Sequence, residues 1–159
     1  MAKPRLLGIS MMQRGLIVAA VLLAASHSVA AADCDAPKSN LQIVPPPAGV
    51  PKSAAAFSGR WQGDWPIVSK KQVLTQCARL YVAVTSAASV SVEQCTGSVK
   101  AANLKPECKY FVAQIDGDTM TFTDLNGGIY TFTMADVGGM LAEATTADHK
   151  SSTQFTKAP

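Results

Sequence analysis

Hydrophobic and polar residues alternate along most of the chain after residue 56. In the first such run, 57–65, aromatic residues and glycines occupy the odd positions, and Ser, Arg, Gln and Asp occupy the even ones. A period of two is typical of a half-buried β-strand, whereas a helix repeats every 3.6 residues. The same pattern predicts seven further strands, at 78–85, 88–96, 109–115, 119–124, 129–134, 140–145 and 151–157.

Short turns separate most of these runs. Three of them contain glycine beside Asp, Asn or a second glycine, at Asp116-Gly117-Asp118, Asn126-Gly127-Gly128 and Val137-Gly138-Gly139. Such residues tolerate the positive φ that tight hairpins need. The one long connection spans 97–107. We therefore expect an all-β fold, a small up-and-down antiparallel barrel of about eight short strands, because closure removes the two exposed edges of a sheet.

The first 32 residues have a different character. Three basic residues come first, followed by ten apolar residues at 16–25 and then small residues as far as Ala32. This order predicts a secretory signal peptide, and the apolar run is much shorter than the ~20 residues of a membrane-spanning helix. The sequence does not decide whether cleavage follows Ala30 or Ala32. It also leaves open whether translation starts at Met1, Met11 or Met12. After cleavage we expect no stable membrane insertion and a periplasmic or secreted protein.

Removal of residues 1–32 changes the net charge. All eleven acidic residues lie after Ala32, and three of the fourteen basic residues lie before it, so the remaining charge is 11 − 11 = 0. A neutral chain without a basic stripe lacks the electrostatic footprint of a nucleic-acid-binding protein, which excludes that function. Residues 33–159 have the length of one domain.

Four cysteines, Cys34, Cys77, Cys95 and Cys108, lie within the predicted exported chain. An even number in such a chain predicts two disulfides, and the wide spacing does not fit a zinc site. The strand pattern permits Cys77 opposite Cys95, or Cys95 opposite Cys108, with the apolar face inward in both cases. We slightly favour Cys95–Cys108 with Cys34–Cys77, because it fastens the long connection, but all three connectivities stay open.

Cys77 opposite Cys95 places Leu80 opposite Val92 across the hairpin, and Cys95 opposite Cys108 places Val92 opposite Phe111.

Upstream of the strands, residues 33–56 contain five prolines and no sustained periodicity. Consecutive prolines favour an extended path, so this segment is expected to be a leader that Cys34 ties to the domain at 57–159.

The run Phe57-Ser-Gly-Arg-Trp-Gln-Gly-Asp-Trp65 resembles the opening of lipocalin-like (calycin-type) bacterial exported domains. The resemblance covers about residues 57–157. It implies a β-barrel and a structural role for Trp61, which closes one barrel end. The opening and the cysteine hairpin also resemble small periplasmic inhibitors of secreted metalloproteases, which implies an N-terminal segment that plugs a protease cleft.

Catalytic chemistry is not evident in the sequence. The only histidine after residue 32 is His149, in a turn and without a nucleophile signature nearby. The Asp116/Asp118 pair fits a hairpin turn better than a calcium site. We therefore expect no enzyme activity, no metal and no cofactor.

Two functional hypotheses follow. The first is a non-enzymatic binding barrel whose open end, near Trp65, Phe122 and Tyr130, holds a small apolar ligand. Trp65 is favoured over Trp61 for this role because it lies at a predicted strand end, before Pro66. The second is an envelope protein-interaction module, such as a protease inhibitor or accessory subunit, that uses the leader or the outer face. A cavity favours the first, and a filled core with a docked leader favours the second. Ligand, partner and oligomeric state are left open.

Overall fold

A computed structural model describes residues 34–135 and 138–159, which belong to one compact unit, 31–159. The predicted signal peptide and part of the turn at Val137 lie outside these residues. Eight strands follow a short helix, α1 (Lys52–Ala56), and a short 3-10 helix, η1 (Lys100–Ala102), connects β3 to β4. The strands are β1 (Gly59–Ser69), β2 (Gln72–Val84), β3 (Ser89–Thr96), β4 (Glu107–Asp116), β5 (Thr119–Thr123), β6 (Ile129–Met134), β7 (Gly139–Thr145) and β8 (Lys150–Lys157).

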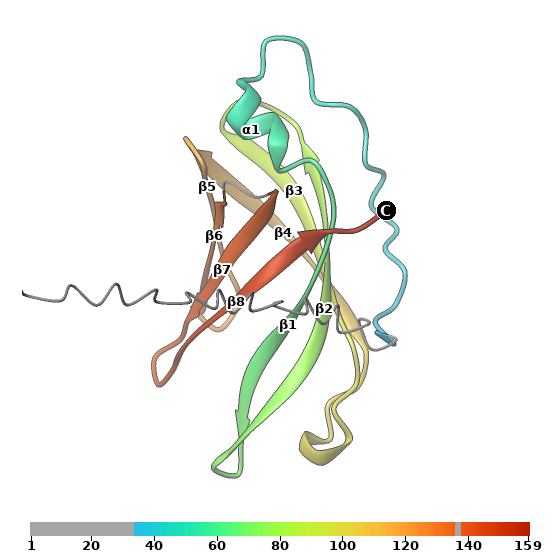
Figure 1. Cartoon of the computed structure of the whole chain (residues 1–159), viewed down its shortest axis with the longest axis vertical. Helices are drawn as coiled ribbons and strands as arrows, with labels where there is room; N and C mark the ends of the chain where they lie inside the picture. Colours follow the sequence, from blue (N-terminus) through green and yellow to red (C-terminus); the bar gives the residue numbers. More distant parts are fainter. Residues whose placement is uncertain (1–33, 136–137) are drawn as a thin grey trace, which may run out of the picture. The chain divides into compact units, whose positions relative to one another are not determined.

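The strands form one closed antiparallel barrel in sequence order (Figure 1). Strand β1 pairs with β2 and also with β8, where Gly63 lies opposite Phe155. A Cβ at Gly63 would lie only 2.8 Å from the Phe155 ring, so the glycine permits this close approach. The expectation of an all-β, up-and-down barrel is confirmed.

One end of the barrel is closed by α1 and the residues that follow it. Ala54 of α1 is buried in the barrel core, and the Phe57 side chain is fully buried. The indole Nε1 of Trp61 donates a 2.8 Å hydrogen bond to the Phe57 carbonyl oxygen. The closing role that the resemblance implies for Trp61 therefore agrees with this geometry. The helix itself, within the predicted leader, was not expected.

The β1–β2 hairpin corrects the predicted strand limits. Strand β1 continues to Ser69 and β2 begins at Gln72, so Trp65 lies inside a strand rather than at its end. Lys70 and Lys71 form the turn with φ of 49° and 65°, in the left-handed region. Glycine and asparagine are the usual residues in such a turn. The sequence pattern missed this hairpin because its turn consists of two lysines.

The β2–β3 register differs by two residues from the one that the Cys77–Cys95 alternative requires. Val82, not Leu80, lies opposite Val92, and the β3–β4 register places Val92 opposite Phe111 as expected. A shift of two leaves every side chain on the same face, so alternation alone cannot detect it. The turn between Val84 and Ser89 is longer than expected, and within it the Ser86 hydroxyl accepts hydrogen bonds from the amides of Ala88 and Ser89.

Two disulfides join Cys34 to Cys77 and Cys95 to Cys108. The expectation of two disulfides is confirmed, and this pairing is the one that the sequence slightly favoured. Cys95 and Cys108 lie directly opposite each other on β3 and β4, whereas Cys95 faces Arg79 on β2. Structural disulfides are typical of proteins in oxidising compartments outside the cytoplasm.

Residues 34–50 contain no helix or strand and run along the outside of the barrel (Figure 1). The Arg79 guanidinium donates hydrogen bonds to the carbonyl oxygens of Cys34 and Ala36, at 3.0 and 3.2 Å. The Glu93 carboxylate accepts hydrogen bonds from the Ser39 hydroxyl and from the amides of residues 40 and 41. The start of the leader is therefore docked on the outer faces of β2 and β3.

Candidate functional site

The barrel end opposite α1 contains a cavity of about 730 Å³. Residues from all eight strands line it, together with residues of the β5–β6 and β7–β8 turns. Ligand pockets for small molecules have volumes of roughly 300–1,000 Å³. The open half of the barrel therefore has room for a small molecule, although the other half is packed with side chains.

Aromatic rings form one wall of this cavity. Trp65, Phe111 and Tyr130 line it, and Phe122 lies between the last two. The Phe111 and Phe122 ring centroids are 4.4 Å apart at 18°, and those of Phe122 and Tyr130 are 5.1 Å apart at 14°. Three nearly parallel rings thus present a stacked aromatic surface, and Trp65 meets the edge of Tyr130 at 5.8 Å.

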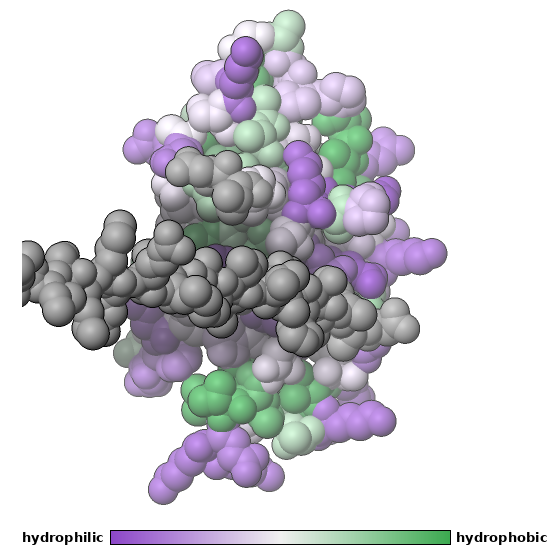
Figure 2. Space-filling view, in the orientation of Figure 1, coloured by the Kyte–Doolittle hydropathy of each residue, from purple (hydrophilic) through white to green (hydrophobic). Residues whose placement is uncertain are grey.

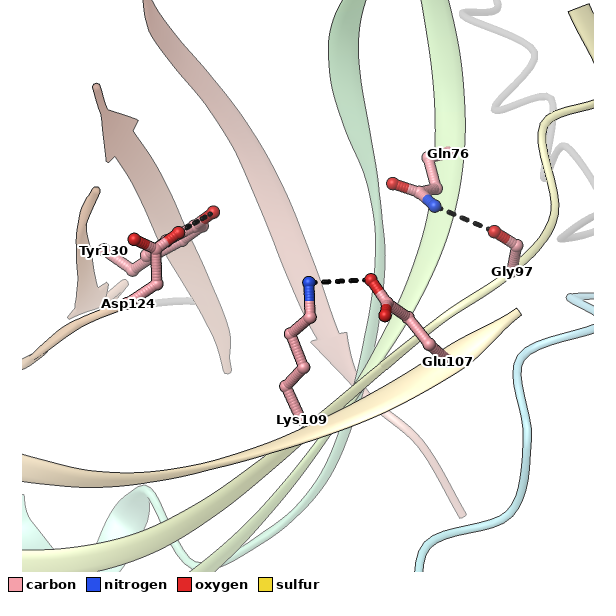
Figure 3. Close-up of polar contacts among 6 residues, drawn as sticks. All are labelled: Gln76, Gly97, Glu107, Lys109, Asp124 and Tyr130. Atoms are coloured by element: carbon pink, nitrogen blue, oxygen red, sulfur yellow. Dashed lines mark hydrogen bonds and ion pairs between the residues drawn. The ribbon is translucent and has the colours of Figure 1, made fainter. Parts of the chain in front are cut away.

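Polar side chains of β2, β3 and β4 form the rest of this lining, and on β4 Lys109 adjoins Phe111 of the aromatic wall. Gln76, Gln94 and Lys109 line the cavity, each in register with the buried apolar residues of its own strand. The Gln76 amide donates a 2.8 Å hydrogen bond to the Gly97 carbonyl oxygen, and Lys109 pairs with Glu107 at 2.7 Å (Figure 3). The cavity lining is therefore part aromatic and part polar.

Asp124 borders the aromatic wall and organises the β5–β6 turn. Its Oδ1 accepts hydrogen bonds from the amides of Asn126 and Gly128, both at 2.8 Å. The Tyr130 hydroxyl donates a long hydrogen bond, 3.5 Å, to Oδ2 of Asp124 (Figure 3). Burial, together with the nearby negative charge of Asp124, raises the pKa of Tyr130. Tyr130 is thus a neutral hydrogen-bonding group near physiological pH.

The Trp65 indole nitrogen is the exception to the hydrogen bonding of this site. The side chain is only 5% exposed, and Nε1 is buried without a hydrogen-bond partner in residues 34–135 and 138–159. A buried donor without a partner costs about 1–3 kcal/mol. Nε1 of Trp61 donates a hydrogen bond to Phe57, whereas Nε1 of Trp65 has no acceptor within the described residues.

The structure brings the three predicted ligand-binding residues together. Trp65 and Tyr130 line the cavity, whereas Phe122, stacked between Phe111 and Tyr130, is buried and does not line it. Gln76, Gln94 and Lys109 were missed, although a signal existed. At the inward-facing positions of β2, β3 and β4, the residues are apolar over most of each strand and change to Gln or Lys near this end of the barrel.

Two further features of the described residues concern titratable and metal-ligating side chains. His149 lines the cavity rim, and its carbonyl oxygen accepts from the Thr146 amide within the turn. Within the described residues, the one group with metal-ligand spacing is Glu93, Cys95 and Cys108, and its two sulfurs are joined in the disulfide.

The rim of the open end also exposes apolar side chains. Val68 and Val73, which flank the lysine turn, are 54% and 74% exposed. Figure 2 shows hydrophobic surface directly above a hydrophilic tip at this end of the barrel. No helix within 34–135 or 138–159 has the length and apolar character to cross a membrane.

No known protein family matches this sequence, and no curated protein is similar to it. Among solved structures, the chain is similar to a redesigned β-barrel, with a TM-score of 0.51 and 16% identity over 68% of this chain and 96% of that chain. It is also similar to a de novo designed fluorescence-activating β-barrel, with a TM-score of 0.50 and 10% identity over 69% of this chain and 100% of that one. At these identities the likeness establishes the fold alone. The closed eight-stranded antiparallel barrel agrees with the β-barrel that the first-strand resemblance implies.

Proposed function

We propose that this protein is an exported, non-enzymatic binding barrel whose open half holds a small, largely apolar molecule. The observation that carries the proposal is the 730 Å³ cavity, with stacked aromatic rings on one wall and a few convergent polar groups in the rest of its lining. This combination is typical of small-molecule sites. Trp65 and Tyr130 would contact the ligand directly, and Phe122 would support the stacked wall.

Export is part of the proposal and rests on two features. The N-terminal residues have the order of a signal peptide, and two disulfides fasten the following chain. In this view the molecule binds its ligand in the periplasm or outside the cell.

The docked leader bears on the alternative, an envelope interaction module. The leader start is fastened by the Cys34–Cys77 disulfide and by hydrogen bonds to Arg79 and Glu93. A docked leader is the feature expected of an interaction module, but a segment that plugs a protease cleft needs to be free at its start, so this docking counts against the inhibitor version alone. The leader surface stays a candidate partner face, but the cavity favours ligand binding.

Titration with N-phenyl-1-naphthylamine, a neutral fluorescent probe, tests the proposal. Ala144 on β7 lines the cavity and is 9% exposed, so Ala144→Trp should fill it and weaken binding at least about tenfold. Leu141→Trp is the matched control, because Leu141 lies on the same strand but faces outward, 44% exposed. We expect saturable binding to the wild type and to the control. Absence of saturable binding to the wild type, or equal weakening by both variants, would overturn the proposal.

A further inference from the structure

We infer that the ligand is a flat, uncharged, conjugated molecule with a carbonyl-type oxygen, and that this oxygen accepts a hydrogen bond from Nε1 of Trp65. The inference rests on the proposed function and specifies its ligand class. Its starting point is the buried indole nitrogen without a partner in the described part of the chain.

The surroundings of Trp65 indicate where an acceptor must come from. Its ring neighbours are Tyr130, Phe132 and Phe155, at centroid distances of 5.6 to 6.2 Å. Two of these side chains contain no oxygen, and the Tyr130 hydroxyl oxygen, which donates to Asp124, does not accept from Nε1. Trp65 also lines the cavity. Because Nε1 itself is shielded from solvent, a molecule in the cavity supplies an acceptor for it once the side chains around this atom shift.

The shape of the ligand follows from the aromatic wall. Phe111, Phe122 and Tyr130 are parallel within 18° from ring to ring. Aromatic rings stack with an offset at centroid distances of about 4.5–7 Å. A flat conjugated molecule continues this stack, whereas a flexible alkyl chain gains nothing from the parallel arrangement.

The charge of the ligand follows from the polar part of the lining. Lys109 is paired with Glu107, so the two charges compensate each other. The remaining inward polar groups of this part include the neutral amides of Gln76 and Gln94, and the opposite rim contains the Asp124 carboxylate. An anion that binds Lys109 would have to displace the Glu107 carboxylate. A neutral carbonyl oxygen satisfies Trp65 without introducing a charge.

The test compares 9-fluorenone with fluorene, flat probes of nearly equal shape that differ by the carbonyl oxygen. We expect the wild type to bind fluorenone about tenfold more tightly than fluorene, and Trp65→Phe to bind the two within about twofold. Trp61→Phe is the control, because it removes an indole donor that is already bonded to Phe57, and it should keep the preference for fluorenone. Circular dichroism verifies that the variants fold.

A second measurement needs no variant. The infrared carbonyl stretch of fluorenone bound to the wild type should move to lower frequency than in a hydrocarbon solvent, because hydrogen bonding weakens the C=O bond. Equal affinity of the wild type for both probes, together with an unshifted stretch, overturns the inference and leaves the proposed function standing. A preference that survives in Trp65→Phe overturns the role of Trp65. Failure of both probes to bind the wild type overturns this inference, and failure of the neutral naphthylamine as well overturns the proposed function.

Discussion

The two ends of the barrel share the same strands but have opposite interiors. At the α1 end, Phe57, Trp61 and inward valines of β2 and β3 fill the barrel, with exposed fractions of 0–1%. At the other end the same faces of β2, β3 and β4 present glutamine and lysine to a cavity. The change occurs within two residues on β3, from buried Val92 to half-buried Gln94.

The same strand pattern thus forms a packed interior at one end of the barrel and a solvated interior at the other. A packed interior stabilises the fold through apolar burial, and a polar group there without a partner is costly. A solvated half-interior tolerates glutamine and lysine because water satisfies them until a ligand enters. The closed end therefore supplies stability, and the proposed function assigns ligand binding to the open end.

The largest expected effect comes from truncating one phenylalanine at each end. Phe57→Ala removes a fully buried ring at the closed end and should lower the free energy of unfolding by about 3–5 kcal/mol. Phe111→Ala removes a half-buried ring beside the cavity and should cost only about 1–2 kcal/mol. Urea denaturation measures both. Equal losses would show that the two ends contribute alike to stability.

A smaller effect is expected from exchanging polar and apolar residues across the boundary on β3. Val92→Gln places an amide in a packed interior and should destabilise the protein by about 2–3 kcal/mol. Gln94→Val should change stability by less than about 1 kcal/mol, or raise it slightly, because water currently reaches this site. Thermal unfolding of both variants tests the position of the boundary. A large loss for Gln94→Val would place Gln94 in the packed half.

The sequence predicted the barrel better than it predicted the site. Alternation identified the strands, yet it left the β2–β3 register undetermined, because a shift of two residues preserves both faces. Trp65 and Tyr130, aromatic residues that the sequence predicts to bind a ligand, do line the cavity, but their role in binding stays a prediction. Gln76, Gln94 and Lys109 were missed because polar residues in a strand resemble solvent-facing ones unless their parity is compared with Leu80, Val82 and Phe111. The missing partner of Trp65 Nε1 depends on packing in three dimensions and has no sequence signal.

The smallest effect concerns a titratable contact beside the open end. The Asp35 carboxylate accepts hydrogen bonds from the Ser98 hydroxyl and the Ser98 amide, in the connection that follows β3. These hydrogen bonds lower the pKa of Asp35 below its usual 3.8, and the bond from the Ser98 hydroxyl has the largest effect. Gly97 permits the contact, because a Cβ there would lie 2.3 Å from Oδ1 of Asp35. The contact that seals the other end, between Trp61 and Phe57, contains no titratable group.

Acid should therefore loosen the leader at the open end and spare the closed end. Because the folded pKa of Asp35 is lowered, its stabilising contribution is complete above pH 3.8 and is lost as the pH falls through the folded value. We expect the Ser98 amide resonance to titrate below pH 3.8, whereas the Trp61 indole resonance stays constant. Asp35→Asn should abolish the Ser98 titration. A Trp61 resonance that moves together with Ser98 would mean that the two ends loosen as one unit, and the separation between a stabilising end and a binding end would fail.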